Sequence, residues 1–128
     1  TGSEVHGIIG ASSFRNFIIE IDYENRIIRL FPPQNFRPPR SSQSFSVDIH
    51  RSKPYLTTEI EMSRDRSFPI KLLIDSGASL AMLLHPNTHP QLEIPQKVIP
   101  GNIGMGLGGS LEGVLGILPA LKLGDSEL

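Results

Sequence analysis

The 128-residue chain contains no cysteine and no tryptophan. Without cysteine it has neither a disulfide framework nor a thiolate zinc site. Its net charge is −1, with 12 basic and 13 acidic residues, so charge gives no reason to expect a nucleic acid or an anionic membrane as partner. No apolar run approaches the roughly 20 residues of a membrane-spanning helix. The composition therefore excludes a disulfide-stapled scaffold and predicts no membrane-spanning segment and no nucleic acid partner.

Glycine and proline are frequent, with 12 and 11 residues, whereas runs of helix-forming residues are scarce. Between these turn formers lie short clusters of Ile, Val, Leu and Phe, a pattern typical of short strands joined by turns. The hydrophobic fraction of 38% permits a core of modest size. The sequence therefore predicts a mainly β fold.

The first part of the chain is predicted to form a short helix and a β-hairpin. Residues 11–16 fit one or two helical turns with Phe14 facing inward. Residues 17–23 and 26–31 are rich in β-branched residues and flank a turn in which Asn25 takes the turn conformation. Residues 32–44 hold four prolines with Ser and Gln, which predicts an extended, solvated linker and a domain boundary.

After this linker the apolar clusters predict a series of strands. They cover residues 45–49, 55–62 and 70–74, followed by a short buried strand at 80–84. Residues 85–101 are predicted to be a loop. A glycine-rich arm then runs out from residue 103 and returns through 118 as a flexible hairpin, and a last strand lies near 120–123.

The most informative motif stands where one apolar run ends. Leu72-Leu73-Ile74 is followed at once by Asp75-Ser76-Gly77-Ala78. A carboxylate at the end of a buried strand is expected to lose water on most sides, while Gly77 lets the backbone turn closely and Ser76 supplies a short hydrogen-bonding arm. Strands also end in Asp-Ser-Gly turns for reasons of backbone geometry alone, so both interpretations stay open.

Two other patterns are less specific. The glycines at 104, 106 and 109 match a dinucleotide fingerprint, yet that motif must open a helix, and Gly113, Gly116 and Pro119 disfavour one. His85 and His89 have the spacing of a zinc-binding helix, but a proline follows each of them. We therefore predict no cofactor and no metal.

With these residues in view, the chain resembles the retropepsin-like aspartic proteases, and more narrowly the bacterial aspartyl proteases that often also carry a PDZ domain. In that family an Asp-Ser/Thr-Gly-Ala loop is followed by a glycine-rich flap and later by an apolar-apolar-Gly segment. The loop matches Asp75, Ser76, Gly77 and Ala78, the flap matches Gly104, Met105, Gly106, Leu107, Gly108 and Gly109, and the segment matches Ile8, Ile9 and Gly10. The resemblance implies a half-barrel built from hairpins with a glycine-rich flap.

The order of these motifs differs from that of one ordinary lobe, because the apolar-apolar-Gly segment precedes Asp75. One interpretation makes residues 1–31 the C-terminal part of a first lobe, 32–44 the linker, and 45–128 the N-terminal part of a second lobe. The chain would then be a fragment, with the other catalytic Asp upstream of Thr1. The alternative is a circularly permuted lobe that dimerises.

The resemblance implies an endopeptidase in which two carboxylates, one of them Asp75, share a proton and activate a water. Ser76 would hydrogen-bond across the lobe interface, and Met105 and Leu107 would touch a peptide or protein substrate. The second carboxylate would come from another Asp-bearing lobe of a longer chain or from a second copy. The family implies a bacterial periplasm or cell envelope. The alternative function is a non-catalytic interaction or dimerisation module with the same fold.

Overall fold

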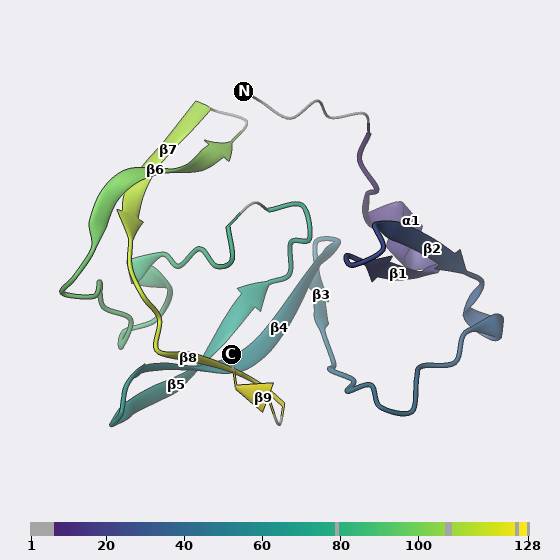
Figure 1. Ribbon diagram of the computed structural model, residues 1–128, viewed down its shortest axis with the longest axis horizontal. Coiled ribbons are helices and arrows are strands. Elements are labelled where there is room, and N and C mark those ends of the chain that lie inside the picture. Colours follow the sequence, from purple (N-terminus) through teal and green to yellow (C-terminus); the bar gives the residue numbers. More distant parts are fainter. Residues whose placement is uncertain (1–6, 79, 107–108, 125, 128) are drawn as a thin grey trace. The chain divides into compact units, whose positions relative to one another are not determined.

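The computed structural model describes residues 7–78, 80–106, 109–124 and 126–127. The chain divides into two compact units, Thr1–Ser44 and Phe45–Leu128, and Figure 1 labels their elements. Within the described residues, strands predominate and one six-residue α-helix is present. This confirms the predicted mainly β class.

The first unit contains helix α1 (Ala11–Asn16) and an antiparallel hairpin of strands β1 (Ile18–Asp22) and β2 (Ile27–Phe31). A short 3-10 helix, Pro33–Asn35, follows, and the rings of Phe31 and Phe36 meet at a centroid distance of 5.4 Å. None of the described residues of this unit is buried. The predicted helix and hairpin are therefore present, on an open surface.

One detail of the first unit differs from the predictions, and a second is confirmed. Phe14 does not face inward but is 52% exposed, because a helix of six residues makes fewer than two turns and the described part of this unit has no buried core for it to face. In the hairpin turn, the Asp22 carboxylate accepts hydrogen bonds from the Asn25 backbone N–H, at 2.9 Å, and from its side-chain amide, at 3.0 Å. Asn25 therefore lies in the turn as predicted, and the next residue, Arg26, is left-handed with φ 58°.

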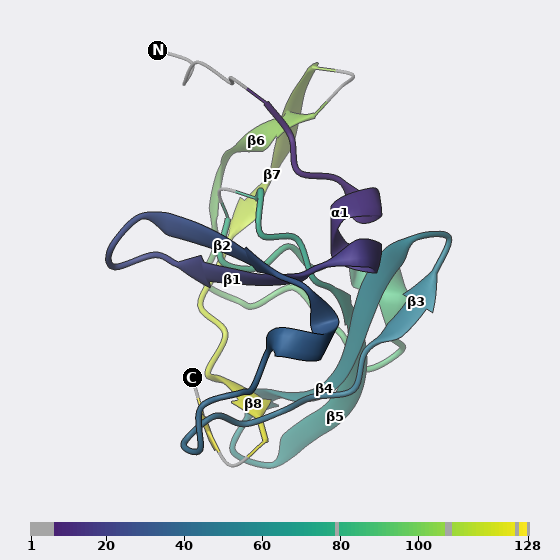
Figure 2. The same cartoon turned by 90° about the vertical axis from the view of Figure 1, so that its right-hand side faces the viewer.

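The second unit is built on a five-stranded sheet. Its strands are β3 (Asp48–His50), β4 (Lys53–Ser63), β5 (Arg66–Leu73), β8 (Ala120–Leu123) and β9 (Ser126–Glu127). The long strand β4 pairs with β5 along one edge and with β3 and β8 along the other, and β9 extends the sheet beyond β8. Figures 1 and 2 show β4 and β5 as the long twisted ribbon of this unit.

The core of the second unit lies on one face of β4 and β5. Ile60 pairs with Phe68 across the two strands, and with Ile70 these side chains are at most 3% exposed. Because alternate residues of a strand point to opposite faces, residues 68, 70 and 72 of β5 share the core side. The His89 ring stacks on Phe68 with a distance of 4.3 Å between the ring centroids. Leu92 is the fourth buried residue of the cluster. The core therefore fixes the strand that leads to Asp75.

Strands β6 (Ile99–Gly106) and β7 (Gly109–Leu115) form a separate two-stranded sheet. They confirm the predicted glycine-rich hairpin, which begins four residues earlier than expected. The predicted strand at 80–84 is wrong, since residues 80–84 form no strand. Leu84 packs against the core from an irregular segment, whereas Leu83 is 45% exposed. The apolar pattern of this segment is explained by side-chain packing against the core, without pairing of its backbone in a sheet.

Candidate active site

Strand β5 carries the chain to Asp75. The strand ends at Leu73, and the Ile74 N–H donates to the carbonyl of Pro54, at 3.0 Å, so β4 still holds the backbone one residue before the acid. The buried face of β5 contains Phe68 and Ile70. Asp75 therefore starts from a backbone position that the core and the β4 partner both restrain.

The Asp75 carboxylate is held by the loop that follows it. Its Oδ1 accepts the backbone N–H of Gly77 at 3.0 Å, and the Ala78 N–H donates to the Asp75 carbonyl at 3.3 Å. A Cβ at Gly77 would lie 3.3 Å from that same Oδ1, so glycine gives the carboxylate room. This is an Asx turn, which fixes one oxygen of the carboxylate with a main-chain donor.

All four residues of the Asp-Ser-Gly-Ala motif are exposed. The expectation that the Asp75 carboxylate loses water on most sides is therefore wrong for this chain, because strand β5 ends at the edge of the core and its last apolar residues, Leu73 and Ile74, are themselves 44% and 46% exposed. Among the described residues, no hydrogen bond joins Asp75 to a second carboxylate. The chain thus presents one oriented acid on an open surface.

The predicted flap residues fall on the β6–β7 hairpin. Gly104, Met105 and Gly106 end β6 and Gly109 begins β7, while Leu107 and Gly108 lie outside the described residues. Gly104 and Gly109 have φ values of 147° and 114°, which favour glycine. In Figure 1 the hairpin is curved. The contact of Met105 with a substrate stays a prediction.

The apolar-apolar-Gly segment lies in the first unit. Ile8 is 90% exposed and Ile9 is 45% exposed. Gly10 precedes helix α1, and its carbonyl accepts the Ser13 N–H at 3.0 Å. The structural role predicted for these three residues beside a catalytic loop stays a prediction.

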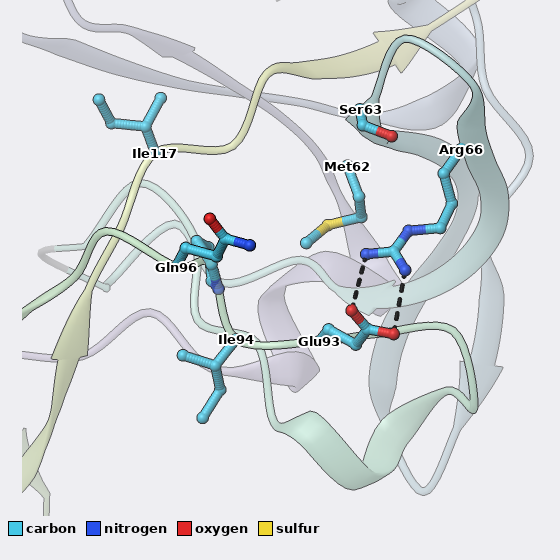
Figure 3. A pocket seen from close by; sticks show the side chains of 8 residues that line it. Met62, Ser63, Arg66, Glu93, Ile94, Gln96 and Ile117 are labelled. Carbon is cyan, nitrogen blue, oxygen red and sulfur yellow. Dashed lines mark hydrogen bonds and ion pairs between the residues drawn. The ribbon is translucent and has the colours of Figure 1, made fainter.

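Sequence reasoning missed a pocket of about 300 Å³ at the start of β5, drawn in Figure 3. The Arg66 guanidinium binds the Glu93 carboxylate through both terminal nitrogens, at 3.0 and 3.1 Å. Met62, Ile94 and Ile117 are among the apolar lining residues. Arg66 begins β5 and Leu73 ends it, so the pocket lies at the end of the strand that is remote from Asp75. The 27-residue separation of Arg66 and Glu93 left no local signal for it.

No family model matches the chain, and neither the curated proteins nor the solved structures contain a match to it. Within the described ranges, no three His, Cys, Asp or Glu side chains gather as a metal ion would need. The helices described here include none long and apolar enough to cross a membrane.

Proposed function

We propose that this chain supplies half of an aspartic endopeptidase with a retropepsin-like fold, in which Asp75 is one of two catalytic carboxylates. The observation that supports this best is the Asx turn at the end of β5, where the Gly77 N–H holds one oxygen of Asp75 at 3.0 Å. A core-anchored strand brings the acid to this turn, and its exposed carboxylate is accessible to water and to a second acid.

The chemistry requires that second carboxylate. Two acids about 3 Å apart cannot both ionise and therefore share one proton. One then accepts a proton from a water as it attacks the peptide carbonyl, and the other donates a proton to the substrate. The pair titrates as a unit, and no covalent enzyme intermediate forms. In this scheme Ser76 hydrogen-bonds across the interface between the two acidic loops.

Apolar surface beside Asp75 supports a covering partner. Leu73 and Ile74 immediately precede the acid, and both keep close to half of their surface in water. In this proposal the second lobe covers these two side chains. We therefore assign this surface to the lobe that carries the second Asp, either in a longer chain or in a second copy.

The β6–β7 hairpin serves as the flap in this proposal. A two-stranded ribbon has unpaired backbone groups along its outer edges, which an extended peptide can use as a strand would. Closure of such a ribbon over the peptide also excludes water during turnover. The substrate is therefore an extended segment of a peptide or protein.

Substitution of the acid in the complete protein tests this function. We expect Asp75→Asn to lower the rate of peptide cleavage by about a thousandfold or more, because the nearly isosteric amide removes the shared proton. The measurement is hydrolysis of a quenched fluorescent peptide library, with thermal unfolding as the check that the fold persists.

Asp65→Asn is the matched control, because Asp65 is an exposed acid in the turn between β4 and β5. It should leave cleavage unchanged. Undiminished turnover by Asp75→Asn would remove Asp75 from the catalytic pair.

The second candidate function is a non-catalytic interaction module. The specific observation in its favour is the exposure of Asp75 beside half-exposed apolar residues, a surface that a partner protein can cover without chemistry. An Asp-Ser/Thr-Gly sequence upstream of Thr1 in the complete protein favours the enzyme. Failure of the complete protein and of a two-copy assembly to cleave any peptide favours the module.

A further inference from the structure

The β6–β7 hairpin contains a bulge near its middle. Asn102 pairs with Glu112 and Gly104 pairs with Leu111, so β6 advances by two residues while β7 advances by one. Ile103 is the extra residue. A bulge bends the strand that carries it and increases the local twist. The bulge therefore sets the direction of the outer half of the hairpin, which contains Gly104 to Gly106 and Gly109 to Leu111.

The side chain of Asn102 closes this bulge on both sides. Its Oδ1 accepts the backbone N–H of Gly104, at 2.8 Å, and its Nδ2 donates to the Ser110 hydroxyl on the opposite strand. The backbone N–H is a donor only, so the side chain must present its oxygen there and its amino group to Ser110. One amide thus links the two residues that flank the bulge to the returning strand.

The opposite strand leaves space for the side chain of the extra residue, Ile103. An added Cβ at Gly113 would lie only 2.7 Å from Ile103 Cδ1, so the absence of a side chain at Gly113 makes room for Ile103 across the hairpin. Gly104 has φ 147°, a value that strains residues with a side chain. The bulge therefore depends on two glycines and one amide, each with its own contact.

We propose that Asn102 is a positioning residue of the flap: it fixes the bulge and thereby holds the outer half of the β6–β7 hairpin in the direction that binds an extended polypeptide. This inference rests on the proposed function for its substrate class. Asn102 acts through the hairpin backbone and does not take part in proton transfer. Its loss therefore weakens polypeptide binding and leaves the chemical step to Asp75.

The test separates binding from cleavage by using the Asp75→Asn variant of the complete protein as background. Fluorescently labelled, unfolded casein is the probe, and its dissociation constant is measured by titration. We expect Asn102→Ala in this background to weaken casein binding by about tenfold, and to speed amide hydrogen exchange at Gly104 by about tenfold, since two hydrogen bonds that close the bulge are lost. Ser110→Ala removes one of them and should have a smaller effect.

Glu112→Ala is the matched control, because Glu112 is exposed and lies opposite Asn102 in the register. It should change neither quantity more than about twofold. Unchanged casein binding by Asn102→Ala, or no casein binding in the Asp75→Asn background at all, overturns the inference. If the Asp75→Asn variant still cleaves peptides, the proposed function is overturned. The comparison of casein binding with and without Asn102→Ala then still decides the role of Asn102.

Discussion

The two long hairpins of the second unit have similar backbones and very different surroundings. Strands β4 and β5 bury Ile60 and Phe68, which are 0% and 2% exposed. On the β6–β7 hairpin, Ile99 is 70% exposed and Leu115 is 48% exposed. An isolated two-stranded hairpin is marginally stable in water, because hydrogen bonds alone contribute little net free energy and apolar burial supplies most of the rest. The stability of the unit is therefore concentrated in β4 and β5.

This difference matches the two tasks in the proposed enzyme. A catalytic carboxylate needs a fixed position, and Asp75 follows the strand that the core restrains. A flap must open and close, and such elements belong to the less stable parts of a fold. The β6–β7 hairpin keeps its own bend through Asn102 while it makes little use of the core. The comparison thus separates a frame, strands β4 and β5, whose core side chains restrain the acid, from a hairpin whose described residues contribute none of the buried core side chains.

The largest expected effect comes from truncating the same residue type in each hairpin. Ile60→Ala should lower the free energy of unfolding by about 2–5 kcal/mol, because it removes a fully buried side chain and leaves a cavity. Ile99→Ala, at a strand position that is 70% exposed, should change it by about 0.5 kcal/mol or less. Urea unfolding of both variants measures the difference. Equal losses would mean that the β6–β7 hairpin is part of the core after all.

A smaller effect is expected where β4 meets β8. The Thr58 hydroxyl donates to the carbonyl of Lys122 at a partly buried position, whereas the side chain of the neighbouring Thr57 is exposed. Thr58→Val should cost about 1 kcal/mol through the lost hydrogen bond, and Thr57→Val should be nearly neutral. Urea unfolding again provides the measurement. A neutral Thr58→Val would show that this side-chain hydrogen bond adds nothing to the backbone pairing and other contacts that hold β8 to β4.

The sequence predicted those parts of the fold that local patterns encode. The hairpin β4–β5, the glycine-rich hairpin and strand β8 all follow from alternating or β-branched residues between turn formers. The segment 80–84 has the same apolar character but forms no strand, because a strand also requires a partner edge, and residue type carries no information about one. Likewise the pattern of α1 did not reveal that Phe14 has no core to face.

At the candidate site, too, the sequence predicted what local patterns encode and not what tertiary packing decides. The motif located the acid and the turn glycine, since the Asp75 to Gly77 bond spans only two residues. Exposure of Asp75 was not predicted, because burial depends on what packs against the end of β5. The Asn102 to Ser110 bond crosses a bulge, and a bulge shifts register in a way that side-chain alternation does not reveal. The Arg66 and Glu93 pair depends on tertiary packing between distant segments.

The smallest expected effect concerns the face of β4 opposite the core and depends on pH. Lys122 lies opposite Glu59 in the register and binds its carboxylate at 2.9 Å. This hydrogen bond, a second one from Ser67 and the attraction of the Lys122 charge lower the pKa of Glu59 below its ordinary value. Because the pKa is lower in the folded state, the pair stabilises the fold at pH values above the ordinary pKa of 4.5, and this contribution is lost as pH falls through the lowered value.

Replacement of that carboxylate tests whether the frame gains stability from its polar face as well as from its core. Glu59→Gln should be slightly less stable than the wild type near neutral pH, and the gap should close on acidification, because protonated Glu59 loses the same interaction. Urea unfolding of both proteins at about pH 7 and about pH 3 measures the gap, with Glu61→Gln on the same strand face as control. A gap that stays constant with pH would remove the ion pair from the forces that hold β8 to β4. The frame would then rest on its buried side chains and backbone pairing, and the contrast with the β6–β7 hairpin would be one of burial alone.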